Sequence, residues 1–66
     1  MQTVNNEILC PKRAARFIGL AVGTLAKMRL RGDGPTFIKT GRRVFYTRRD
    51  LLAWLEDRRF TSTSEY

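Results

Sequence analysis

The chain has 66 residues, of which 42% are hydrophobic and 11% are aromatic, and its formal net charge is +7. This length is close to the smallest at which one hydrophobic core keeps a chain folded, so we expect a single domain. The hydrophobic content is too high for a disordered chain, and no apolar run approaches the roughly 18 residues of a transmembrane helix, so we expect neither class.

The N-terminal stretch "MQTVNNEIL" has neither the basic start nor the apolar centre of a secretory signal, so we expect a cytoplasmic protein. Cys10 is the single cysteine, and the chain has no histidine. An internal disulfide is therefore impossible, and a zinc site lacks partners for the cysteine. We expect no metal and no cofactor.

Two short helical patterns follow. The stretch "CPKRAARFIGL" has Pro11 in a first-turn position and Gly19 as a stop, which predicts a helix of about two turns. The stretch "AVGTLAKMRLRG" places Leu25 and Met28 on one stripe and ends at Gly32. Two helices joined by a short turn that contains glycine form the helix-turn-helix pattern.

A β-hairpin is predicted after the break at "GDGP". Aromatic and β-branched residues dominate "TFIKT" and "RVFYT", which flank a turn at Gly41. The register stays open, because a two-residue turn pairs Ile38 with Phe45, whereas a three-residue turn pairs Ile38 with Tyr46. We prefer the three-residue turn, since it puts Ile38, Val44 and Tyr46 on one buried face.

The last pattern, "RRDLLAWLEDRR", is helical. Thr47 followed three residues later by Asp50 is a variant capping box, which predicts the start of this helix. The residues that we expect in the core are Ala14, Ala15, Ile18, Leu25, Met28, Ile38, Val44, Tyr46, Leu51, Trp54 and Leu55. The sequence thus predicts a mainly α fold with a β-hairpin at residues 8–59, between flexible tails at 1–7 and 60–66.

The positive charge is concentrated in one third of the chain. Residues 27–49 carry eight basic residues and one acidic residue, a net charge of +7, and the remaining residues sum to zero. Charge concentrated in this way favours a polyanionic partner. A surface that serves only solubility would work as well with scattered charge. Anionic lipid is disfavoured, because glycines and a proline interrupt the basic segment.

Catalytic chemistry has little support in the sequence. Cys10 has no evident base, and histidine is absent. The acidic residues are Glu7, Asp33, Asp50, Glu56, Asp57 and Glu65. Their spacing is typical neither of a metal site nor of an acid/base pair, so we do not expect an enzyme.

The order helix, turn, helix, hairpin, helix resembles the excisionase and AlpA-type winged helix-turn-helix family of small phage and mobile-element DNA-binding proteins. The resemblance covers about residues 8–59 and rests on "PKRAARFIGL", "TLAKMR", "GDGPTFIKTGRRVFY" and "RRDLLAWL" taken together. The chain departs from the family pattern at Cys10 and Ala21, where the family usually has a Ser or Thr helix cap. A missing cap costs about 1 kcal/mol, which does not forbid the fold.

The resemblance implies which residues meet double-stranded DNA. The second helix of a helix-turn-helix protein enters the major groove, where Gly23, Thr24 and Lys27 are the candidates. The hairpin tip would place Arg42 and Arg43 in an A·T-rich minor groove, whose enhanced negative potential attracts arginine. The expected phosphate contacts are Arg29, Arg31, Lys39, Arg48 and Arg49.

The function that the resemblance implies is that of an excisionase, which binds beside a recombination site, bends the DNA and directs a tyrosine or serine integrase toward excision. An AlpA-like transcriptional regulator needs the same contacts at a promoter, so this alternative stays open, as does an adaptor that docks on a recombinase. Single-stranded RNA is less expected, because the aromatic residues are needed for the core.

We expect a free monomer that assembles cooperatively, head to tail, on DNA, with Leu52 and Phe45 between neighbours.

Overall fold

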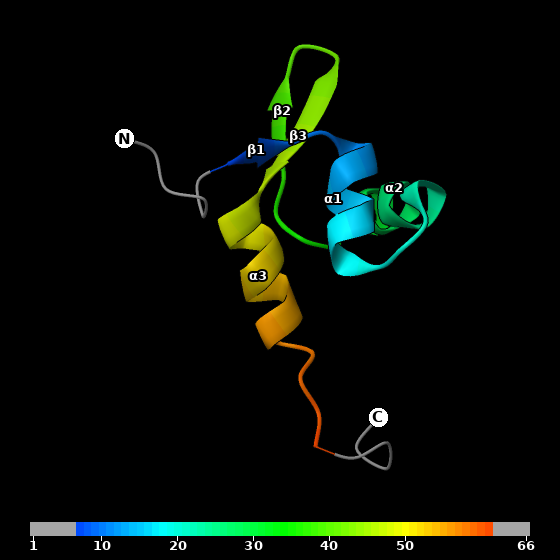
Figure 1. The fold of residues 1–66 in the computed structure, drawn as a ribbon. Coiled ribbons are helices and arrows are strands. Elements are labelled where there is room, and N and C mark those ends of the chain that lie inside the picture. The colour runs from blue at the N-terminus through cyan, green and yellow to red at the C-terminus, as the bar shows by residue number, and fades with distance from the viewer. Residues whose placement is uncertain (1–6, 62–66) are drawn as a thin grey trace.

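The computed structural model describes residues 7–61. The elements in this range are β1 (Ile8–Leu9), α1 (Pro11–Ile18), α2 (Val22–Arg31), β2 (Ile38–Thr40), β3 (Arg43–Thr47) and α3 (Arg48–Glu56). The hairpin of β2 and β3 projects from one end of the fold, and α3 extends in the opposite direction (Figure 1). Of the predicted tails, residues 1–6 and 62–66 lie outside the described residues. We call β2, β3 and the turn between them the wing.

The two predicted helices at the start of the domain are confirmed. α1 has Pro11 in its first turn, and α1 and α2 end at Gly19 and Gly32, whose φ angles are 78° and 81°. Glycine adopts this left-handed backbone without steric cost, which is why it ends both helices. The N–H of Leu20 donates to the carbonyl of Ala15 at 2.9 Å and closes the turn between the helices.

Both helices begin without a side-chain cap, as the departures at Cys10 and Ala21 suggested. The pKa of the Cys10 thiol is lowered, chiefly because the backbone N–H of Arg13 faces the sulfur, although no cap hydrogen bond of standard geometry forms. Burial of the thiol opposes this effect. The first turn of α1 therefore favours the thiolate, because its free N–H groups attract negative charge.

The wing has a two-residue turn, and the three-residue turn that we preferred is wrong. The pairs are Ile38 with Phe45, Lys39 with Val44, and Thr40 with Arg43. Gly41 has a φ of 61°, whereas Arg42 has no positive φ, the pattern of a type II′ turn with glycine in its first position. The three-residue alternative needs a left-handed backbone at Arg43, which costs a residue other than glycine about 1–2 kcal/mol.

The corrected register moves Ile38 off the buried face. Val44 and Tyr46 face the core as predicted, but Ile38 lies on the opposite face beside Phe45 and is 38% exposed. Side chains alternate between the two faces of a strand, so a shift of one residue in pairing reverses the face of Ile38. The turn geometry therefore determines the register, not the number of apolar side chains that it buries.

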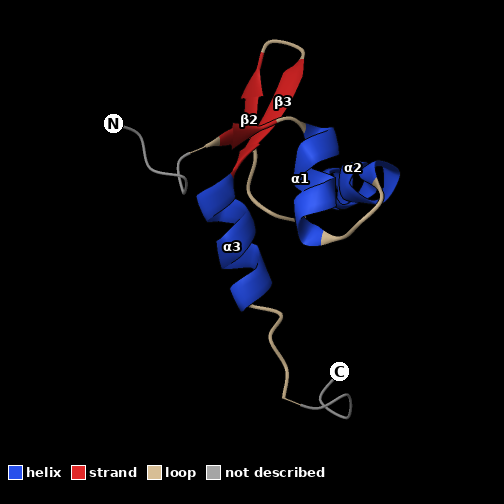
Figure 2. Cartoon of the chain, viewed as in Figure 1, coloured by secondary structure: helices blue, strands red, loops and turns tan. Residues whose placement is uncertain are grey.

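A third strand was not predicted. β1 pairs antiparallel with β3 through Ile8 with Thr47 and Leu9 with Tyr46, so β3 is the central strand of the order β1-β3-β2. Figure 2 shows the strands gathered on one side of the helices. This pairing buries Leu9, a residue absent from the predicted core. The sheet thereby connects the start of α1 to the start of α3.

α3 begins as predicted, at a cap formed by Thr47. Its hydroxyl accepts a hydrogen bond from the backbone N–H of Asp50 at 3.0 Å. Leu51 is fully buried, and Trp54 follows on the same side of the helix and is half-buried. The indole Nε1 of Trp54 donates to the carbonyl of Asp33 at 3.4 Å. α3 is therefore attached to the loop that leads from α2 into the wing.

One small core holds these elements together. The buried hydrophobic residues are Leu9, Ala14, Ala15, Leu25, Tyr46 and Leu51. Predicted core residues that are only half-buried are Ile18, Met28, Val44, Trp54 and Leu55. Tyr46, Leu25 and Leu51 are the largest fully buried side chains, and they come from β3, α2 and α3. The core thus fixes a wing and a closing helix to a helix-turn-helix, which is the winged helix-turn-helix fold that the sequence predicted.

Candidate nucleic-acid interface

α2 presents two of the predicted contact residues on its outer side. Leu25 is fully buried and defines the inner side of the helix. At 3.6 residues per turn, Gly23 and Lys27 project to about the opposite side, and both are exposed. Thr24 is also exposed, but it lies on the flank of the helix, about 100° from Leu25. The structure therefore places Gly23 and Lys27 at the centre of the outer face of α2 and Thr24 at its edge.

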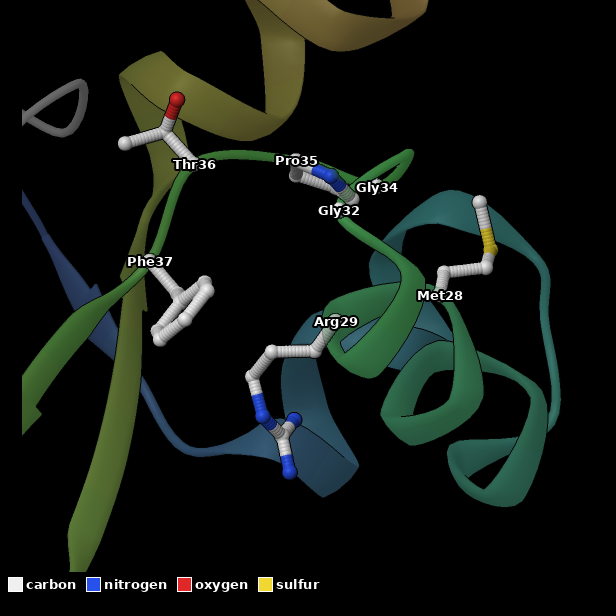
Figure 3. A pocket seen from close by; sticks show the side chains of 7 residues that line it. All are labelled: Met28, Arg29, Gly32, Gly34, Pro35, Thr36 and Phe37. Carbon is white, nitrogen blue, oxygen red and sulfur yellow. The ribbon is translucent and has the colours of Figure 1, made fainter.

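Arg29 connects α2 to the wing. Its Nη1 donates to the hydroxyl of Tyr46 at 3.1 Å, and its guanidinium lies 5.8 Å from the ring centroid of Phe37. Both Arg29 and Phe37 line a pocket of about 250 Å³ between the end of α2 and the segment before β2, and their side chains point into the same gap (Figure 3). Arg29 was predicted as a phosphate contact, but part of its hydrogen-bonding capacity is used within the fold.

The wing carries basic side chains at its far end. Lys39, Arg42 and Arg43 are exposed, and Arg42 occupies the second position of the turn. The guanidinium of Arg43 lies 5.4 Å from the ring centroid of Phe45, a cation–π contact that restricts its motion. No ion pair within residues 7–61 neutralises these three side chains. The predicted wing residues are therefore brought together and are free to meet an anion.

The two arginines at the start of α3 differ in their surroundings. Arg49 is exposed, whereas Arg48 is half-buried, with its Nη2 3.3 Å from Oε1 of Glu7 and its guanidinium 5.0 Å from the ring centroid of Phe17. Nε of Arg48 is buried and has no hydrogen-bond partner in the described part of the chain. Arg48 thus helps to attach residue 7 and α1 to α3, a role that the sequence did not reveal.

Arg31 is paired as well, although weakly. Its Nε lies 3.2 Å from Oδ2 of Asp33, and both side chains are largely exposed. An exposed pair of this kind contributes about 0–1 kcal/mol, so a phosphate can replace the carboxylate at little cost. Arg31 therefore remains available to an anionic partner.

Sequence analysis missed a second group of basic side chains, on α1. Lys12, Arg13 and Arg16 are exposed, and the first turn of α1 has no acidic residue. Arg13 and Arg16 also line a pocket of about 200 Å³ with Arg48 and Glu7. The count of charges by sequence window hid this group, because acidic residues elsewhere in the chain balance it. The spacing of these residues opposite the buried Ala14 and Ala15 was the signal that could have revealed it.

Residues 7–61 include no group of three His, Cys, Asp or Glu side chains that could hold a metal ion. Over the same range, none of the helices has both the length and the apolar character needed to span a bilayer.

Comparison with protein families gives one match. The model of a family described as "Helix-turn-helix domain" matches residues 11–59, which run from the first residue of α1 to beyond the end of α3. No curated protein matches the chain. The match covers most of the sequence and includes α1, α2, the wing and α3.

Proposed function

Since the chain belongs to the helix-turn-helix domain family, that of small excisionase and AlpA-type DNA-binding proteins, we propose that α2 and the wing bind one double-stranded DNA site together. In this proposal Gly23, Lys27 and, at the edge, Thr24 face the major groove. Arg42 and Arg43 enter the adjacent minor groove, where A·T-rich sequence favours arginine. The protein acts in the cytoplasm and has no catalytic activity of its own.

The observation that carries the proposal is the attachment of α2 to the wing. The hydrogen bond from Arg29 to Tyr46 and the shared buried core fix the outer face of α2 relative to the hairpin. Two basic surfaces held by one rigid core can contact successive grooves of one duplex without a loss of flexibility on binding. Lys39, Arg49 and Arg31 are the proposed phosphate contacts around them, with Arg29 and Arg48 contributing less because they already have partners within the fold.

The binding constant is expected to fall steeply with salt concentration. Five exposed basic residues on this surface have no ion pair among the described residues, namely Lys27, Lys39, Arg42, Arg43 and Arg49. Each phosphate neutralised contributes a slope of about −0.9 in log K against log salt, so five contacts predict a slope of about −4.5. Fluorescence anisotropy with a labelled duplex, titrated at several salt concentrations, measures it. A slope near zero contradicts DNA binding by this surface and favours an adaptor that docks on a recombinase.

For the biological role, we propose an excisionase-like function, in which the bound protein bends DNA beside a recombination site and directs an integrase toward excision. The family includes both excisionase and AlpA-type proteins, and regulation at a promoter by the second type requires the same contacts. A recombination assay with the integrase encoded nearest to this protein distinguishes them. Stimulated excision supports the first role, whereas unchanged recombination together with a response of a promoter reporter supports the second.

We also propose that the free protein is monomeric and that copies bind adjacent DNA sites cooperatively, head to tail. Leu52 is 39% exposed on α3, and Phe45 lies on the wing face that points away from the core. Weak contacts suffice between neighbours on one duplex, because the DNA holds them at high effective concentration. On two tandem sites, Leu52→Ala is expected to reduce cooperativity in a band-shift titration while single-site affinity stays within about twofold. Phe45→Ala is expected to reduce cooperativity as well, but its single-site affinity should also fall, because the Phe45 ring packs against Arg43. Independent filling of the two sites by the native protein, or a stable dimer without DNA, contradicts this proposal.

A further inference from the structure

α2 carries an exposed apolar line that the predicted contacts do not use. Val22, Ala26 and Leu30 are four residues apart and therefore follow one another along the same side of the helix. Val22 is 48% exposed, Ala26 is partly exposed, and Leu30 is 86% exposed, more than any other large hydrophobic residue in the described range. A solvated helix face normally carries polar residues at such positions.

The contacts of Arg29 show where this line lies relative to the wing. Arg29 projects toward Tyr46 and Phe37, so its direction marks the wing side of α2. At about 100° per residue, Ala26 and Leu30 lie about 60° and 100° around the helix from Arg29, and Lys27 lies about 160° from it. The apolar line therefore runs between the wing side of α2 and Lys27. A duplex that touches both Lys27 and the wing has to pass over it.

The chemistry of the major groove identifies what such a line can read. The edges of the base pairs present hydrogen-bond donors and acceptors, and thymine adds the C5-methyl group, the apolar group that distinguishes its edge. Leu30 and Val22 have no donor or acceptor in their side chains, so they can favour only an apolar partner. We propose that Val22, Ala26 and Leu30 contact thymine methyl groups, and that these contacts make α2 prefer thymine at defined positions of its site.

The neighbours of the line favour DNA over a protein partner as its occupant. Lys27 and Arg31 flank it on the outer side of α2, and the basic wing lies on the other side. An apolar strip between basic surfaces matches a groove lined by phosphates, in which methyl groups project from the base edges. This inference rests on the proposed function, because it assigns a base preference to the helix that is proposed to enter the groove.

The test uses duplexes selected by the native protein from a random-sequence pool. Each thymine of a selected duplex is replaced in turn by deoxyuridine, which removes the C5-methyl group and retains the hydrogen-bonding groups of the base. Burial of one methyl group corresponds to about a fourfold change in affinity. The native protein is therefore expected to bind about fourfold less tightly when a contacted thymine is replaced, and two contacted thymines are expected to give about a fifteenfold loss.

The Leu30→Ala variant makes the test specific. This variant is expected to bind thymine and deoxyuridine duplexes equally at the position that Leu30 contacts, and to retain the native discrimination at other positions. On a duplex that binds a single copy, Leu52→Ala, which shortens a leucine on α3, is expected to keep the full native discrimination. Circular dichroism is expected to give unchanged thermal unfolding for Leu30→Ala, since the side chain is largely exposed.

The outcomes separate the two proposals. Equal affinity of the native protein for every thymine and deoxyuridine pair overturns the methyl contacts but leaves DNA binding intact. Native discrimination by Leu30→Ala at every position removes Leu30 from the base contacts and overturns the part of the proposal that concerns this residue. Failure of the native protein to enrich or bind any duplex from the pool contradicts the proposed function itself.

Discussion

Leu51→Ala is expected to lower the free energy of unfolding by about 2–5 kcal/mol, because it leaves a cavity where the side chain packed. Leu51 is fully buried and belongs to the same cluster as Tyr46 and Leu25, so it joins α3 to the sheet and to α2. A domain of this length has a total stability of roughly 3–10 kcal/mol. The variant should therefore be largely or partly unfolded at room temperature, which urea titration followed by circular dichroism measures.

The adjacent residue provides a matched control. Leu52→Ala makes the same chemical change one position along the same helix, but Leu52 is 39% exposed and does not belong to the buried cluster. Its loss of stability should be below about 1 kcal/mol, since a partly solvated side chain leaves little cavity. Similar losses for the two variants would mean that α3 does not pack through the side that the structure indicates.

Local signals in the sequence predicted the helices, because each signal acts within a few residues. Pro11 at the start of α1, Gly19 and Gly32 at the two helix ends, and the Thr47 hydroxyl at the start of α3 all operate as the sequence suggested. Such signals satisfy or end backbone hydrogen bonds directly and do not depend on distant parts of the chain.

The wing register was also readable from a local signal, but we weighed it less than burial. Gly41 stands at the first position of the loop, which is the glycine position of a type II′ turn. A three-residue turn places its glycine at the end of the loop, and Arg43 stands there. The preference for burying Ile38 therefore opposed a turn signal that the sequence already contained. β1 could not be predicted in this way, since it has only two residues and forms by pairing with β3.

The candidate site also has features that the sequence predicted and features that it could not predict. The sequence pattern correctly predicted that Lys27 on α2 and Arg42 and Arg43 on the wing are exposed. It could not predict that Arg29 binds Tyr46 or that Arg48 pairs with Glu7, because these contacts join residues far apart in the chain. Whether an exposed arginine is available to a ligand depends on such contacts. The tertiary structure therefore distinguishes the predicted phosphate contacts that are unpaired within residues 7–61 from those that already have a partner, whereas the sequence could only name them.

The largest loss of DNA affinity is expected from the double variant Arg42→Ala/Arg43→Ala. Each arginine is proposed to enter the minor groove, and a groove contact of this kind is worth about 1–3 kcal/mol, so removal of both should weaken binding by at least about 30-fold. The loss should be greatest on A·T-rich flanking sequence, where the narrow minor groove has the strongest negative potential. Anisotropy titrations with A·T-rich and G·C-rich flanks around the same central sequence measure both effects.

A change of net charge alone would also weaken binding, so the control removes the same charge elsewhere. Arg58→Ala/Arg59→Ala lowers the net charge by the same two units just after α3, at the end of the fold opposite the wing (Figure 1). Arg58 also lies 4.0 Å from the ring centroid of Trp54 and donates to the carbonyl of Asp33 at 3.5 Å, so circular dichroism first checks that this variant keeps the native thermal unfolding. Charges far from the duplex are screened beyond about 10 Å at 0.1 M salt, so this variant should lose less than about threefold and show no dependence on the flank. The wing pair should also lower the slope of log K against log salt by about 1.8, whereas the control pair should leave it unchanged. Equal losses for the two double variants on both flanks would place the wing outside the DNA interface.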